Sequence, residues 1–126
     1  MERMKKLFLV ALPLLLAGCN SITNLTPSKQ TRNPAGLYPV EIEWRSRQDT
    51  IIQGKIEPKV MIGTNFFPMR AVPVVSNRWE TLISVPANEK EIYYRFKFDY
   101  LYRSIPNPLP DSKLSPEYKL EIADPK

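Results

Sequence analysis

Histidine is absent from this sequence of 126 residues, which also contains a single cysteine, Cys19. Without histidine the chain lacks the commonest general base and the commonest protein ligand for metals, and it cannot form a Ser-His or Cys-His nucleophile pair. With one cysteine it cannot form an intramolecular disulfide, so its stability must come from a packed hydrophobic core. These absences argue against an enzyme, and we predict a protein with no cofactor and no metal site.

Glycine is also scarce, with four residues against thirteen prolines. This balance disfavours phosphate-binding loops and long helices, and it favours β structure with proline at edges and turns. The chain has 18 Lys and Arg against 13 Asp and Glu, of which three basic residues and one acidic residue lie within the first six positions. The remainder therefore has 15 basic and 12 acidic side chains, a net charge of +3. An excess this small gives no reason to expect a nucleic-acid partner.

The first 19 residues have the pattern of a secretion signal. Three basic residues precede an apolar run at residues 7–16, and Leu16-Ala17-Gly18-Cys19 closes this run with small residues before the cysteine. The run is shorter than the ~20 residues of a membrane-spanning helix, and Pro13 interrupts it. The alternative to a cleaved signal is a buried N-terminal helix of the mature fold.

This pattern resembles the signal of bacterial lipoproteins. The resemblance implies cleavage after residue 18, a lipid on Cys19 and attachment of the mature chain to a membrane through that lipid. Asn20, the residue after the cysteine, implies the outer membrane if the host has one. Residues 19–36 are rich in Ser, Thr, Asn and Pro with little apolar periodicity, so we predict a flexible tether there, followed by one domain at residues 37–124.

Alternation of apolar and polar residues predicts short strands along the domain. In the first, residues 37–45, one face carries Trp44 and three other large side chains. Further strands are predicted at residues 50–56, 59–62, 79–85 and 118–122. Residues 66–75, broken by two prolines, are predicted to form an edge strand or an irregular connection, and residues 104–116, with four prolines, a surface loop.

The strongest strand pattern is EIYYRFKFDYLYR, residues 91–103, which holds six of the thirteen aromatic residues. Its even-numbered positions form one apolar face, and we predict that Phe96 and Phe98 are buried there beside Trp44, Trp79 and Ile83. Six to seven short strands without a helical stretch predict an all-β fold, a β-sandwich.

The order of motifs also resembles the immunoglobulin-like glycogen-binding domains, the family 48 carbohydrate-binding modules. Val60-Met61-Ile62-Gly63, Val85-Pro86 and Tyr94-Arg95-Phe96-Lys97-Phe98-Asp99 occupy the places of that family's core and turn motifs in the same order. The resemblance covers nearly the whole predicted domain and implies an immunoglobulin-like, early-set sandwich. It places Arg95 where the family has a sugar-binding lysine and Tyr102 near a sugar-stacking tryptophan, whereas Phe66-Phe67-Pro68-Met69 replaces the other tryptophan site.

Apolar residues also occur on the polar side of the aromatic strand. We identify a candidate binding surface there from its composition and from the resemblance: Tyr93, Arg95, Lys97, Leu101 and Tyr102. The alternative is that Tyr93 and Leu101 cover a neighbouring strand. Asp99 and Asp111 are too isolated to indicate a metal site, and Glu41 and Glu43 fit the solvated face of a strand better than paired catalytic acids.

Three functions follow as hypotheses. The first is a membrane-anchored, non-catalytic binding or scaffolding module, an accessory subunit of a cell-envelope assembly with a protein partner. The second, which the family resemblance implies, is a carbohydrate-binding lipoprotein that recognises glucan or cell-wall glycan. An enzyme is the third and weakest hypothesis.

Overall fold

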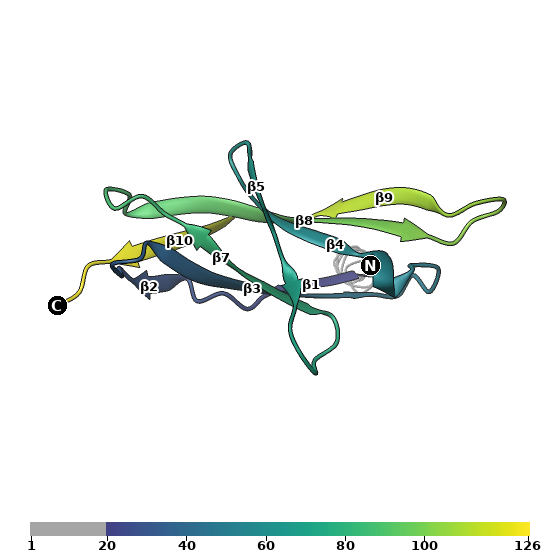
Figure 1. The fold of residues 1–126 in the computed structure, drawn as a ribbon, viewed down its shortest axis with the longest axis horizontal. Helices are drawn as coiled ribbons and strands as arrows, with labels where there is room; N and C mark the ends of the chain where they lie inside the picture. Colours follow the sequence, from purple (N-terminus) through teal and green to yellow (C-terminus); the bar gives the residue numbers. More distant parts are fainter. Residues whose placement is uncertain (1–19) are drawn as a thin grey trace, which may run out of the picture.

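Two β-sheets packed face to face make up residues 20–126, the part of the chain that the computed structural model describes (Figure 1). The predicted signal peptide, residues 1–18, and Cys19 lie outside the described residues. The smaller sheet has the order β1-β3-β7-β6 and comprises β1 (Asn20–Asn24), β3 (Leu37–Ser46), β7 (Arg78–Ser84) and β6 (Arg70–Ala71). The predicted all-β fold, a sandwich of two sheets, is confirmed.

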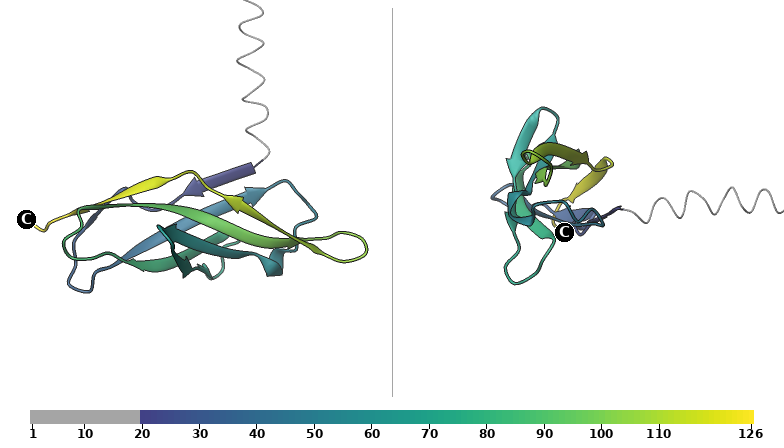
Figure 2. Two further views of the ribbon diagram at one scale, coloured as in Figure 1. Left: turned by 90° about the horizontal axis from the view of Figure 1, so that it is seen from above. Right: turned by 90° about the vertical axis from the view of Figure 1, so that its right-hand side faces the viewer.

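The larger sheet has the order β2-β10-β8-β4-β5, with β9 as an additional partner of β8. Its strands are β2 (Lys29–Thr31), β10 (Tyr118–Ala123), β8 (Glu91–Tyr102), β4 (Glu57–Ile62), β5 (Asn65–Pro68) and β9 (Leu109–Leu114). The β2–β10 pair is parallel, whereas all the other pairs are antiparallel. The molecule is elongated, with the turn after β8 at one end and the C-terminal residues at the other (Figure 2).

The core lies between the inward faces of β3 and β8, as their alternation predicts. On β8, Phe96 and Phe98 are fully buried, and on β3, Trp44 stacks on Phe98 with ring centroids 4.7 Å apart. Trp79 is half-buried and meets the same phenylalanine edge-on at 5.9 Å. Ile83 belongs to the same buried cluster. The predicted burial of the two phenylalanines beside these residues is therefore confirmed.

Strand β8 is the centre of the larger sheet because it pairs along both edges. β4 lies along one edge, and β10 and β9 divide the other edge between the first and second halves of β8. Ser115 stands where the pairing changes from β9 to β10, and it is buried. Its Oγ accepts a hydrogen bond from Phe96 N at 2.7 Å, and its backbone N–H donates to Phe96 O at 2.9 Å. A side-chain oxygen thus satisfies a buried donor at the break between two strands.

The prediction of a flexible tether at residues 19–36 was wrong for most of its length, and the domain begins before residue 37. β1 pairs with β3 over Asn20–Asn24, and Asn24 Nδ2 donates to the hydroxyl of Tyr94 at 2.8 Å. β2 pairs with β10, and Arg32 bonds the carboxylate of Asp124 at 2.6 Å. The polar composition of this segment suggested a tether. It forms strands nevertheless, because partners distant in sequence, β3 and β10, supply the pairing.

Two further segments differ from the predictions. Residues 50–56 were expected to form a strand, but Gln53–Lys55 form a short 3-10 helix, η1, and Ile51 makes an isolated bridge with Tyr102. Residues 104–116 were expected to form a loop, yet Leu109–Leu114 form β9. Pro110 fits there because β9 is an edge strand, where a missing N–H costs no ladder bond. Residues 20–126 contain ten strands, β1, β2 and β9 among them, rather than the six to seven predicted.

Candidate functional site

The outward-facing side of the larger sheet brings together four of the five residues of the predicted surface. The odd-numbered residues of β8 from Tyr93 to Leu101 point away from the core, since the even-numbered ones are buried. These residues form one surface with the outward side chains beside them on β4, β5, β9 and β10. We call this surface the β8 face. Tyr93, Arg95, Lys97 and Leu101 all belong to it.

Tyr102 does not belong to this face, and its inclusion in the predicted surface was wrong. It falls on the even-numbered side of β8 and packs against the core cluster. The period of two that placed the other residues outward places this one inward. The family resemblance had suggested it as an exposed aromatic platform, a role that its position does not fit.

Three apolar side chains on the β8 face are each about half exposed. Tyr93 is 51% exposed, Phe66 on β5 is 50% exposed, and Leu114 on β9 is 49% exposed. Leu114 pairs with Lys97, so the register places it beside a predicted residue. Phe66 pairs with Met61, which in turn pairs with Arg95, so Phe66 lies on the same face one strand further out. Phe66 and Leu114 were missed from the sequence because their strands contain or adjoin prolines and carry no clear alternation.

The charges of this face are largely paired with one another. Lys59 Nζ lies 3.1 Å from one carboxylate oxygen of Asp99, and Lys97 Nζ lies 3.3 Å from the other. Arg95 contacts the carboxylate of Glu117, which follows β9, at 3.3 Å. The exposed apolar side chains are therefore surrounded by ion pairs of both signs, which give the surface little net field and offer hydrogen-bonding groups at its rim.

Asp99 is held in its ionised form by this arrangement. Burial acts to raise the pKa of its carboxyl group, but hydrogen bonds from Lys59 and Lys97 and the charges of both ammonium groups outweigh burial and bring the pKa below its ordinary value of 3.8. An acid of lowered pKa remains a carboxylate at neutral pH, which suits ion pairing and not proton donation.

Replacing Asp99 with asparagine is expected to lower stability at neutral pH by less than about 1 kcal/mol, since the pairs are partly solvated. A folded-state pKa below the unfolded one adds stability that is present above the unfolded pKa and is lost as the pH falls through the folded pKa. The gap between wild type and Asp99→Asn should therefore close below about pH 3.8. Urea midpoints measured across this range test it. A gap that persists in strong acid would contradict the ion-pair assignment.

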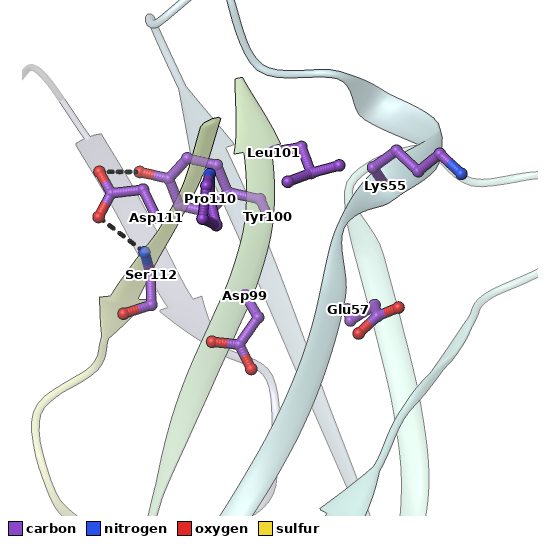
Figure 3. Close-up of a pocket in the computed structure, with 8 residues that line it drawn as sticks. All are labelled: Lys55, Glu57, Asp99, Tyr100, Leu101, Pro110, Asp111 and Ser112. Atoms are coloured by element: carbon purple, nitrogen blue, oxygen red, sulfur yellow. Dashed lines mark hydrogen bonds between the residues drawn. The ribbon is translucent and has the colours of Figure 1, made fainter. Parts of the chain in front are cut away.

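A groove of about 550 Å³ lies at the end of the β8 face, between β4, β8 and β9 (Figure 3). Glu57 and Asp99, which are cross-strand partners, line it from β4 and β8. On β9, Asp111 accepts hydrogen bonds from the hydroxyl of Tyr100 at 3.2 Å and from the Ser112 backbone N–H at 2.8 Å, as Figure 3 shows. Burial, together with the charge of Asp111 and its hydrogen bond, raises the pKa of Tyr100.

The acidic groups of the described residues are dispersed over both sheets. Among residues 20–126 no group of three or more acidic or other metal-ligating side chains is placed to hold a metal ion. Glu43, on the other sheet, pairs with Arg45 and lies 4.0 Å from Arg78. The carboxylate of Glu43 is therefore engaged by two arginines. Glu57, in contrast, is exposed and has no ion-pair partner within residues 20–126.

No protein-family model and no curated protein sequence matches this chain. Among solved structures, the chain is similar to a structure of murine CRIg with 12% identity and a TM-score of 0.41, over 84% of this chain and 99% of that one. A likeness at this level carries no argument about function. Within residues 20–126 there is no helix with the length and apolar character needed to cross a membrane.

Proposed function

We propose that this chain is a lipid-anchored, non-catalytic binding module of a bacterial cell envelope, and that its β8 face contacts a protein partner. The anchor part of the proposal rests on the lipoprotein-like pattern that ends at Cys19, with Asn20 favouring the outer membrane. The observation that supports the binding part is the group of half-exposed side chains Phe66, Tyr93 and Leu114 on one sheet face. Such groupings mark interaction sites on proteins.

The form of the β8 face fits a protein better than a small substrate. Its apolar groups stand on four-residue to twelve-residue strands of one sheet, so their positions are fixed before a partner binds. Aromatic residues and arginine, here Tyr93, Phe66 and Arg95, are enriched in the energetically important centres of protein interfaces. The ion pairs around them can exchange partners or form a polar rim.

Site-specific loss of a partner is the test. The lipidated chain is crosslinked in its own host and recovered from detergent-solubilised membranes. We expect the wild type to bring down a partner protein, and we expect the triple variant Phe66→Ser/Tyr93→Ser/Leu114→Ser to lose it. The matched control is Leu37→Ser/Leu82→Ser, because Leu37 and Leu82 are 41% and 52% exposed on the outer face of the other sheet. Recovery that survives the β8 variant, or is lost equally in the control, would overturn the choice of face.

A glycan is the second candidate ligand, favoured by one observation on the same face. The exposed ring of Tyr93 lies beside a hollow of about 220 Å³ that Arg95 and Glu117 also line. A flat aromatic ring next to hydrogen-bonding groups suits a sugar ring. Affinity electrophoresis with α-glucans and cell-wall glycans separates the two candidates. If the ligand is a glycan, the migration of the protein should be retarded in a saturable way, and Tyr93→Ala or Arg95→Ala should abolish this retardation.

A further inference from the structure

The position of β1 determines which part of the domain adjoins the proposed lipid. Asn20, the residue that follows Cys19, pairs with Ser46 at the last position of β3. Because the predicted tether is replaced by strand, a lipid on Cys19 would be attached within one residue of a rigid sheet. The part of the sandwich around the end of β3 would therefore be held next to the bilayer.

Two segments form this end of the molecule. They are the connection after β3, residues 47–56, and the turn between β8 and β9, residues 103–108, and we call them together the anchor end. A backbone hydrogen bond joins them, because Arg103 N donates to Thr50 O at 2.7 Å, and next to it Ile52 N donates to Leu101 O of β8 at 2.9 Å. The turn after β8 projects at this end, whereas the C-terminal residues lie at the opposite end (Figures 1 and 2).

The anchor end carries exposed cationic side chains, of which Arg103 also donates a hydrogen bond to Asp49 O at 2.9 Å. Arg47, Lys55 and Arg103 are exposed, and none has a carboxylate within ion-pair distance among residues 20–126. Asp49 is the only acidic residue of the two segments, so their net charge is +2, and Glu57 and Asp111 lie with Lys55 in the adjoining groove. Arginine and lysine close to a membrane are attracted by anionic lipids within about a Debye length of the surface.

An apolar side chain completes the anchor end. Ile105 is 97% exposed in the turn between β8 and β9, two residues from Arg103, and Leu109 at the start of β9 is 45% exposed. An isoleucine this exposed gains nothing from the fold of its own chain. A bulky apolar residue next to cations is the combination by which peripheral proteins contact the boundary between headgroups and acyl chains.

We infer that the anchor end is a membrane-contact surface, in which Arg47, Lys55 and Arg103 bind anionic lipid phosphates and Ile105 enters the headgroup layer. This inference rests on the proposed lipid at Cys19. The contact fixes the orientation of the domain, so that β8 stands away from the membrane plane and not along it. The β8 face is then presented to partners beside the membrane.

Probe depth in the lipidated, full-length chain tests this orientation. An environment-sensitive dye is placed on Asn107→Cys in the β8–β9 turn or on Ala87→Cys in the turn before β8, both at exposed positions. Lipidation consumes the thiol of Cys19, so the new cysteine is the single free one. The two sites flank the 12 residues of β8, which span about 40 Å at ~3.3 Å per residue. In phosphatidylcholine vesicles with added phosphatidylglycerol and a headgroup nitroxide, we expect quenching at position 107 and none at position 87.

Charge and apolar variants identify the cause of any quenching. Arg47→Gln/Lys55→Gln/Arg103→Gln and, separately, Ile105→Ser should each reduce quenching at position 107, and raised salt should do so for the wild type. The matched control, Lys29→Gln/Lys90→Gln/Lys126→Gln, removes three exposed charges elsewhere and should leave quenching unchanged. Equal quenching at positions 107 and 87, or none at either in a lipidated chain, overturns the inference. A mature chain whose mass lacks the lipid instead overturns the proposed function, so the two failures are distinct.

Discussion

Phe96→Ala is expected to lower the free energy of unfolding by about 3–5 kcal/mol. Phe96 is fully buried at the middle of β8, where its ring meets Tyr94 edge-on with centroids 5.6 Å apart and Tyr118 at 6.0 Å. Truncation removes the transfer free energy of the ring and leaves a cavity between rigid sheets. The loss is a large share of the ~5–15 kcal/mol that stabilises a typical domain. Without a disulfide in reserve, the variant is expected to be marginally folded.

Lys97→Ala is the control for Phe96→Ala, because it changes the next residue of β8 on the opposite side. The Lys97 side chain is 35% exposed, and Asp99 keeps its contact with Lys59 when Lys97 is removed. The expected cost is below about 1 kcal/mol. Shifts of the denaturant midpoint at constant slope compare the two variants. Similar losses would mean that both sides of β8 are buried, and the β8 face would cease to be a candidate binding surface.

Cys19→Ser is expected to abolish membrane retention altogether. Cys19 is the only cysteine of the chain, so the substitution removes the only thiol to which a lipid could be attached. Uncleaved precursor or protein released from the membrane should accumulate. Fatty-acid labelling followed by fractionation measures both effects in one experiment. Unchanged labelling together with unchanged membrane association would exclude the lipoprotein-like pattern as the anchor.

Ser21→Ala serves as the control for Cys19→Ser, because it alters an exposed residue of β1 two positions further on. It leaves the thiol and the pattern from Leu16 to Cys19 intact. Labelling and fractionation should remain those of the wild type. If both variants lose the lipid, the effect lies in the processing of the N-terminal region and not in the acceptor thiol.

The strands that could be predicted from the sequence are those whose own residues specify their burial. β3 and β8 alternate large apolar and polar residues, so the period identifies both the strand and its inward face. The same reasoning placed Tyr93, Arg95, Lys97 and Leu101 together on an outward face. The proline-broken segment 66–75 forms two short edge strands, β5 and β6, in accordance with the prediction for that segment.

The strands that could not be predicted depend on distant partners. β1 contributes Ile22, which packs against the core opposite Trp44, but its neighbours Ser21 and Thr23 are polar and the segment reads as a linker. β9 exists because β8 extends beyond β10 and offers it an unpaired edge. The exposure of Leu114 followed from that pairing, so one part of the candidate site could not be inferred from local pattern.

The parallel pairing of β2 with β10 has a consequence for how the domain folds. It joins the beginning and the end of the described chain, and the Arg32–Asp124 bond beside it spans 92 positions of sequence. Contacts of such long range slow folding, because a large loop must close before they form. Under the proposed export in extended form, the larger sheet could not be completed until residues 118–123 had emerged, so the nascent domain would stay open during transport.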